Sequence, residues 1–195
     1  MRPQTAAMLS LALGIQALAQ DQYALRFDIQ DDTLLPGQST SITLAAAYGS
    51  NWALATVGTE LVASTGSDGL SDWALIAPLD GPGTTPGALS ATGVDGILAG
   101  QLNFPPAGPW EPQPNPIPFW TATYTAPTDV AAPFDVTLST LTSRYEVYIS
   151  RDDPVGRSRL DDLVEGSAVI RVIPAPASAL VLVGLPAITT RRRSG

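Results

Sequence analysis

The sequence predicts an all-β fold, an Ig-like antiparallel β-sandwich of the jelly-roll kind. Three observations support this fold class. Short segments of alternating apolar and polar residues recur along the chain, turn-forming Gly and Pro residues separate them, and no segment between residues 20 and 172 has the pattern of a long amphipathic helix. A series of short strands without long helices is typical of two antiparallel sheets packed face to face.

The first part of the chain contains four expected strands. In the first of them Tyr23, Leu25 and Phe27 alternate with Ala24 and Arg26, which is the period of a half-buried strand. A Pro-Gly pair later marks a turn before the second strand. The four expected strands are Tyr23–Ile29, Thr40–Tyr48, Trp52–Ser64 and Ser71–Pro78.

The stretch Asp80–Pro118 is dense in Gly and Pro and is expected to form long surface loops in extended or polyproline conformation. One strand, Ile97–Phe104, is expected inside it. Because strand patterns resume on its far side, we interpret this stretch as part of the same domain and not as a linker.

The second half of the chain continues the strand pattern. Trp120, Ala122 and Tyr124 alternate with three threonines in the most regular of these segments. A charged loop, Asp152–Gly166, is expected to hold one helical turn near Leu160–Leu163. The expected strands are Phe119–Thr125, Phe134–Leu141, Arg144–Ser150 and Ser167–Ile173.

The N-terminus, residues 1–19, has the pattern of a secretory signal peptide that forms a short helix. Arg2 precedes the apolar stretch Ala6–Leu18, and Ala17 and Ala19 form an A-x-A cleavage site for signal peptidase. The mature chain is therefore expected to begin at Gln20 or Asp21. The alternative is an uncleaved N-terminal helix.

The C-terminus, residues 173–195, combines a proline motif, an apolar run and a basic cluster. Its apolar run Ala177–Thr190 has 14 residues and no charge, which as a helix spans roughly 21 Å, against a bilayer core of about 30 Å. Three arginines follow the run and would stay on the cytoplasmic side. This membrane topology agrees with export directed by the N-terminal signal. The motif and the cluster consist of Pro174, Ala175 and Pro176, and of Arg191, Arg192 and Arg193.

This order of motif, short hydrophobic helix and arginine cluster resembles the PEP-CTERM sorting tail of exosortase substrates in Gram-negative bacteria. Ala175 stands where the motif has Glu. The resemblance implies an exosortase-like processing enzyme as a partner, with transient anchoring in the inner membrane through the tail. It also implies a final location in the cell envelope or outside the cell. The alternative is a C-terminal anchor that is never cut.

The domain between the two ends, residues 20–172, is strongly acidic. It contains six arginines, no lysine and 18 acidic residues, which gives a formal net charge of −12 against −8 for the whole chain. Such a charge disfavours nucleic acid as a partner. The chain has neither Cys nor His, so disulfides, Ser-His-Asp and Cys-His catalysis and the usual zinc sites are excluded.

The middle domain also resembles cohesin-type or carbohydrate-binding-module-type sandwiches. The resemblance rests on Leu35–Gln38 before the second strand, the aromatic strand Phe119–Tyr124 and the closing segment Gly166–Val172. It implies a cohesin-like, non-catalytic fold. It does not imply dockerin binding, because no residues match a dockerin-contacting motif.

Carboxylates and one tryptophan are the candidate site residues. Two oxygen-rich loops suggest a calcium site, and calcium is the only cofactor that the sequence suggests. Neither loop has the ligand spacing of an EF-hand. The alternatives are a solvated acidic surface, which we favour, and a glycosidase, which needs two facing carboxylates. Trp110 lies between Pro109 and Glu111 in the proline-rich stretch and is the candidate platform for a sugar ring. The other three tryptophans are expected in the core. The candidate calcium ligands are Asp68, Asp72, Asp152, Asp153, Asp161 and Asp162.

From the sequence we therefore expect a non-enzymatic exported protein of the cell surface or extracellular matrix, sorted through its tail. The alternative function is a carbohydrate- or calcium-binding module, with extracellular polysaccharide as a candidate partner. A hydrolase is the third hypothesis, and it requires a cleft with a pair of carboxylates.

Overall fold

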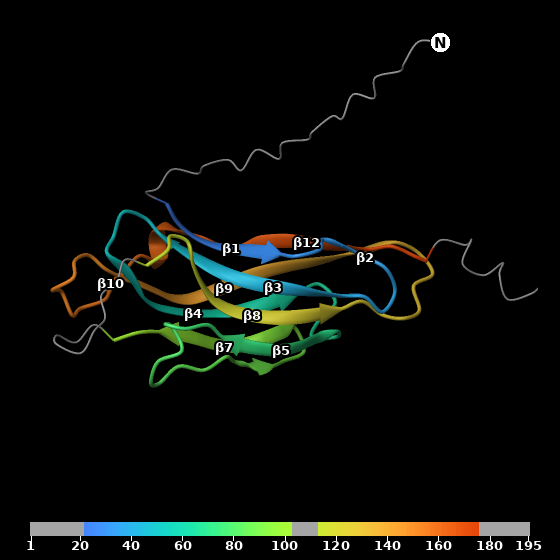
Figure 1. Cartoon of the computed structure of the whole chain (residues 1–195), viewed down its shortest axis with the longest axis horizontal. Coiled ribbons are helices and arrows are strands. Elements are labelled where there is room, and N and C mark those ends of the chain that lie inside the picture. Colours follow the sequence, from blue (N-terminus) through green and yellow to red (C-terminus); the bar gives the residue numbers. More distant parts are fainter. Residues whose placement is uncertain (1–21, 103–112, 176–195) are drawn as a thin grey trace, which may run out of the picture.

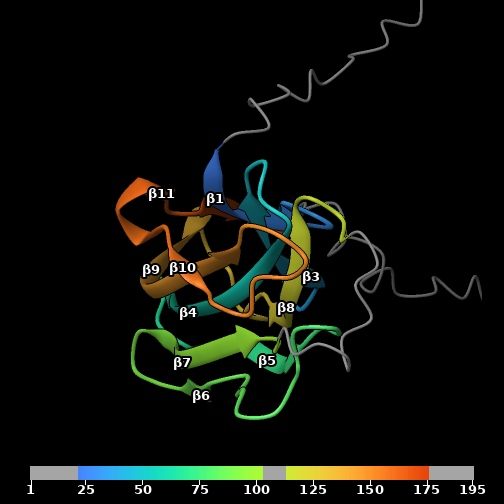
Figure 2. The same ribbon diagram turned by 90° about the vertical axis from the view of Figure 1, so that its left-hand side faces the viewer.

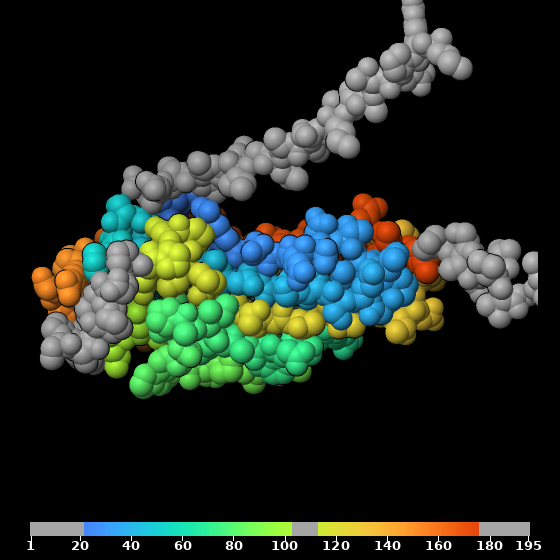
Figure 3. Space-filling view, viewed as in Figure 1, coloured from blue at the N-terminus to red at the C-terminus, as the bar shows by residue number. Residues whose placement is uncertain are grey.

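The computed structural model describes residues 22–102 and 113–175, and these form two packed β-sheets (Figure 1). The five-stranded sheet has the order β11-β1-β3-β8-β5. Its strands are β1 (Tyr23–Ile29), β3 (Ser39–Tyr48), β5 (Leu70–Leu75), β8 (Ile117–Thr125) and β11 (Leu163–Val164). Four of these strands lie side by side at the front of Figure 1 and make one continuous face in the space-filling view (Figure 3).

The seven-stranded sheet lies behind the first and has the order β2-β12-β9-β4-β7-β6, with β10 paired to β9. Figure 2 shows the two layers from one end of the sandwich. The strands of this sheet are β2 (Thr33–Leu34), β4 (Ala53–Ala63), β6 (Ala88–Leu89), β7 (Gly93–Gly100), β9 (Phe134–Tyr148), β10 (Arg157–Ser158) and β12 (Ser167–Val172). A single 3₁₀ turn, η1 (Leu160–Asp162), occurs in the described ranges.

The predicted all-β sandwich is confirmed. Neighbouring strands pair antiparallel except at β1–β11 and β12–β2, which are parallel. The first expected strand has the predicted bounds, and the helical turn lies within one residue of its predicted place. In contrast, the expected strand Ile97–Phe104 begins earlier and is β7, which ends at Gly100.

The two strands expected at Phe134–Leu141 and Arg144–Ser150 are one long strand, β9. A register shift opposite β4 lies between the pairs Thr59–Thr142 and Gly58–Arg144, so that Ser143 is an extra residue. Before this bulge the even-numbered residues such as Leu138 face the core, and after it the odd-numbered residues do. The bulge interrupts the alternation without ending the strand, which is why the sequence pattern divided it.

The core lies between the sheets and contains Trp120, Tyr124, Tyr145 and Phe119 as its largest buried side chains. Trp120 is fully buried, as expected. Trp73 and Trp52 are only partly buried, although the sequence placed them in the core: the first packs against the main core, and the second against a small cluster of Ala53, Ala55 and Tyr148.

Tyr145 connects the two sheets through its hydroxyl group. The hydroxyl donates a buried hydrogen bond of 2.7 Å to the carbonyl oxygen of Ala47 in β3. Burial raises the pKa of Tyr145 far above its ordinary value, so the hydroxyl keeps the proton that it donates.

The strand that leads into the C-terminal tail is fixed up to its last residue. The amide of Ile173, directly after β12, donates to the carbonyl of Leu34 at 2.9 Å. Residues 174 and 175 follow as coil at the end of the sandwich opposite to the start of β1 (Figure 1). In the described ranges there is no helix with the length and apolar character needed to span a bilayer.

Candidate functional site

A shallow pocket of about 190 Å³ lies on the outer face of the seven-stranded sheet, over β4 and β7. Val57 and Tyr145 point into the core, so that Thr56 of β4 and Arg144 of β9 lie on the outer face. A loop that precedes β6 forms the opposite wall. The lining residues are Thr56, Gly81, Pro82, Gly83, Thr84, Leu98, Ala99, Gly100, Gln101, Leu102 and Arg144.

The loop wall, residues 81–84, is held against β7 by backbone hydrogen bonds on both sides. The amide of Gly100 donates to the carbonyl of Leu79 at 2.9 Å. Thr85 and Leu98 exchange two amide-to-carbonyl bonds, each of 2.9 Å. The wall therefore has the regularity of a sheet edge, and the pocket is preformed.

Two tryptophans attach the same loop to the body of the domain. The indole N–H of Trp120 donates to the carbonyl of Pro86 at 3.0 Å, and that of Trp73 donates to the carbonyl of Gly87 at 3.2 Å. A partly or fully buried indole needs such an acceptor. Two tryptophans of the five-stranded sheet are thus bonded to the loop that forms one wall of a pocket on the other sheet.

Three glycines leave room for the pocket and its neighbours. A Cβ at Gly58 would lie 3.2 Å from the Cβ of Arg144, which is tighter than ordinary packing. A Cβ at Gly100 would lie 3.1 Å from the carbonyl oxygen of Ala55, and one at Gly81 would lie 3.1 Å from the carbonyl oxygen of Gly100. Larger residues at these positions would narrow the pocket or displace the arginine.

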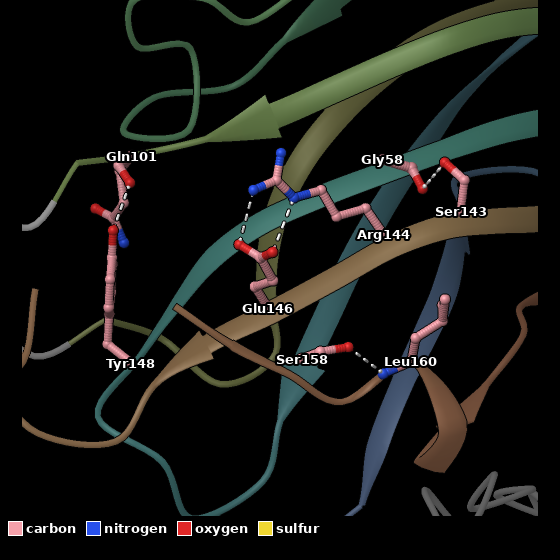
Figure 4. Close-up of polar contacts among 8 residues, drawn as sticks. All are labelled: Gly58, Gln101, Ser143, Arg144, Glu146, Tyr148, Ser158 and Leu160. Atoms are coloured by element: carbon pink, nitrogen blue, oxygen red, sulfur yellow. Dashed lines mark hydrogen bonds and ion pairs between the residues drawn. The ribbon is translucent and has the colours of Figure 1, made fainter. Parts of the chain in front are cut away.

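Arg144 and Glu146 form a two-pronged ion pair on the outer face of β9 (Figure 4). The guanidinium Nε and Nη2 atoms donate to the two carboxylate oxygens at 3.0 and 3.1 Å. The arginine side chain is 54% exposed, so solvent screening makes this pair worth only about 0–1 kcal/mol of stability. Its main effect is to orient the guanidinium.

Gln101 lines the pocket directly after the end of β7. Its side-chain amide donates to the carbonyl of Leu54 at 2.6 Å, and its backbone carbonyl accepts a bond of 3.0 Å from the hydroxyl of Tyr148 (Figure 4). Tyr148 is itself buried in the small cluster beside Trp52. Gln101 is thus fixed through both its side chain and its backbone.

The same outer face carries exposed apolar side chains. Leu141 of β9 is 60% exposed, and Val169 of β12 is 48% exposed, while Leu102 at the pocket is 56% exposed. Apolar side chains beside polar groups and a pocket are typical of binding surfaces.

The candidate calcium ligands are distributed over three regions: the turn before β5 and β5 itself, the loop after β9, and η1. Asp72 has φ +54° and accepts a bond of 3.0 Å from the Ser71 hydroxyl. In the described ranges no group of three or more acidic side chains is arranged to hold a metal ion. The structure does not test calcium binding, which stays a prediction.

Asp153 is occupied by neighbours in its own loop. It accepts a bond of 2.9 Å from the amide of Val155 and forms an ion pair of 3.2 Å with Arg157. The backbone bond from Val155, aided by Arg157, lowers the pKa of the Asp153 carboxyl group.

Other predicted residues fall outside the described ranges. These are the sugar-platform candidate Trp110, the cleavage-site residues Ala17 and Ala19, Pro176 of the sorting motif, and the cluster Arg191–Arg193. Pro174 and Ala175 are described, and they directly follow the last hydrogen-bonded residue of the sandwich.

Sequence reasoning did not find the pocket. The run Gly81-Pro82-Gly83 was recognised only as a loop, and Arg144 only as the start of a strand. The one available signal was an arginine on a strand of a domain with few cations, directly after the residue at which the apolar alternation changes phase. It gave no indication that Gly81–Thr84 would lie opposite.

No protein-family model matches this chain, and no curated protein matches it at a significant level. Several solved structures are similar in backbone. A cohesin module from a Clostridium perfringens family 33 glycoside hydrolase has 9% identity and a TM-score of 0.49, over 80% of this chain and 99% of its own. The sixth cohesin of Acetivibrio cellulolyticus scaffoldin B, solved with a dockerin, has 11% identity and a TM-score of 0.49, over 79% and 99%.

A type I cohesin from Pseudobacteroides cellulosolvens has 12% identity and a TM-score of 0.45, over 86% of this chain and 98% of its own. The cohesin likeness expected from the sequence is therefore found among solved structures. At these identities and TM-scores it establishes no shared function, and the sandwich is assigned from the strand pairing described above.

Proposed function

We propose that this chain is a non-enzymatic exported protein of the cell surface or extracellular matrix. In this proposal its β-sandwich binds a partner protein through the outer face of the seven-stranded sheet. The observation that carries the binding role is the combination on that face of a preformed pocket with the exposed side chains of Leu141 and Leu102.

The chemistry of the pockets supports binding and not catalysis. The chain has no His or Cys to act as base or nucleophile. A carboxylate mechanism needs two facing acids. Among the described residues, no acidic residue lines the pocket at Arg144. Each of two larger surface hollows has a single acidic residue in its lining, Asp31 in one and Glu165 in the other.

The export part of the proposal comes from the two ends of the chain. Signal peptidase would cut after Ala19, and an exosortase-like enzyme would act at the motif beginning with Pro174. Because Ile173 is still bonded to the sandwich, that motif would be presented directly at the edge of the folded domain.

The intact mass of the protein recovered from the cell envelope and the medium tests the export route. A mass that corresponds to a start near Gln20 and an end near Pro176 is expected. A mass that retains Arg191–Arg193 would show that the tail is only an anchor, and a protein found solely in the cytosol would refute export.

Photo-crosslinking in the producing cells tests the binding face. A benzoylphenylalanine at Leu141 is expected to crosslink one protein that is not crosslinked from the matched position Thr123, on the outer face of the other sheet. With that protein purified, Leu141→Glu should weaken binding by about tenfold or more, and Thr123→Glu should not. Equal crosslinking from both faces, or equal affinity of the two variants, would refute this assignment of the face.

A further inference from the structure

We propose that the pocket beside Arg144 receives the carboxylate side chain of an aspartate or glutamate on the partner protein. This inference deepens the proposed function and rests on it, because it names the group that the outer face would recognise. It is carried by the charge, the size and the donor geometry of the pocket.

The lining of the pocket differs in charge from the rest of the domain. The domain has a formal net charge of −12, whereas Arg144 is the only charged residue that lines this pocket within the described part of the chain. Glu146 does not line the pocket, but it pairs with Arg144 and offsets much of its charge. The attraction for an anionic group is therefore short-ranged and limited to the guanidinium N–H groups that Glu146 does not occupy.

The size of the pocket fits one side chain. Its volume of about 190 Å³ is below the roughly 300–1,000 Å³ of pockets that enclose small ligands. It is shallow and open to the outer face, where a partner surface would lie. A side chain that projects from that surface is therefore a better occupant than a free metabolite.

The donor geometry comes from the ion pair. Glu146 takes bonds from Nε and Nη2 of Arg144, and the structure gives Nη1 no partner within the described ranges. In Figure 4 the third nitrogen of the guanidinium points away from Glu146. Because the guanidinium is already oriented, a carboxylate that binds to its free side does not have to order the arginine first.

Small lining side chains and room on the floor leave space for a carboxylate. Thr56 and Thr84 line the pocket with small polar side chains, and the hydroxyl of Thr84 is directed to the carbonyl of Gly81 at 2.6 Å. Gly100 leaves the floor without a side chain. A planar carboxylate can thus approach Arg144 without displacing a lining side chain.

Saturation-transfer NMR on the purified full-length chain in nonionic detergent tests the proposal with defined probes. The first probe is N-acetyl-glutamate N-methylamide and the second is its glutamine counterpart. We expect the glutamate probe to bind roughly fivefold or more tightly than the glutamine probe, and the difference to shrink at high salt. Equal binding of the two probes, or no saturation of the glutamate probe, would overturn the proposal.

Variants locate the effect. Arg144→Gln should abolish the preference for glutamate, and Arg144→Lys should keep part of it because the charge remains without the planar fork. Arg171→Gln is the matched control, since Arg171 is exposed on β12 of the same sheet and does not line the pocket. An unchanged preference in Arg144→Gln, or its loss in Arg171→Gln, would contradict the assignment.

Two further outcomes separate this inference from the proposed function. Tighter binding of inorganic phosphate than of the glutamate probe would show that the pocket selects a different anion. If Arg144→Gln left the affinity for the crosslinked partner unchanged while Leu141→Glu weakened it, the binding face would stand and the carboxylate site would be wrong.

Discussion

Gly93, the first residue of β7, should tolerate no side chain. Its φ is +152°, which residues with a Cβ rarely adopt. A Cβ built there would overlap the carbonyl oxygen of Leu61 and lie 3.0 Å from its carbonyl carbon. Both atoms belong to the backbone of β4, so no rotamer change can relieve the overlap. Gly93→Ala must therefore separate β4 from β7 locally.

The cost can be estimated against Gly96 on the same strand. Gly96 has φ +70° and no described atom within 4 Å of the position that a Cβ would take, so Gly96→Ala carries only the backbone strain of about 1–2 kcal/mol. Gly93→Ala adds the loss of ladder hydrogen bonds near the pairs Leu61–Val94 and Val62–Gly93, each worth about 1 kcal/mol. With the loosened packing of buried Val94, the total is about 4 kcal/mol.

Urea and thermal unfolding of the two variants measure this difference. For a domain of this size about 1 kcal/mol corresponds to roughly 2–4 °C, so Gly93→Ala should lower the Tm by roughly 8–16 °C and Gly96→Ala by roughly 2–8 °C. If the two variants lost the same stability, steric overlap with Leu61 could not be the reason that Gly93 is required.

Four other substitutions have defined outcomes. Tyr145→Phe should cost about 1–2 kcal/mol in urea unfolding, because the carbonyl of Ala47 loses its buried donor; an unchanged midpoint would contradict this. Glu165→Ala should speed hydrogen exchange of the Thr142 amide, since the Glu165 carboxylate accepts bonds from that amide and from the hydroxyls of Thr140 and Thr142. An exchange rate equal to that of the unchanged protein would show that Glu165 does not protect this amide. Asp153→Asn should flatten the fall in Tm as the pH drops from about 5 to about 3. The pKa of Asp153 is lower in the folded state than in the unfolded state, so its carboxylate stabilises the fold above the unfolded-state pKa, and this stabilisation is lost as the pH falls through the folded-state pKa. An unchanged slope of Tm against pH would mean that the bonds of Asp153 to Val155 and Arg157 do not contribute to stability. Arg144→Gln should change stability by less than about 1 kcal/mol in the same unfolding experiment, and a larger loss would mean that the arginine supports the fold.

The sequence allowed strands such as β1 and β8 to be predicted because apolar and polar residues alternate along them. β1 has the bounds that the alternation of Tyr23, Leu25 and Phe27 indicates. β9 was divided in two because the bulge at Ser143 moves the core-facing positions from even to odd numbers. A pattern with a fixed period cannot distinguish a bulge from the end of a strand.

The short strands and the pocket depend on contacts between distant segments. β2 has two residues and exists because it pairs with the C-terminal strand β12. The pocket needs Gly81–Thr84, Leu98 and Arg144 to meet, and their positions are set by the register of β4 against both β7 and β9. Nothing in the local sequence of any one segment specifies that register.

The attachment of the final strand has a mechanical consequence. β12 is bonded along its length to β9 on one side and, near its end, to β2 on the other, and the bonding continues to Ile173. A pull on the chain beyond residue 175, directed along the strand, would load these hydrogen bonds together in shear and not one after another. Force from a tethered tail would then pass through β12 and β9 to β4 beneath the pocket, so the sheet that is proposed to hold the partner would also bear the load.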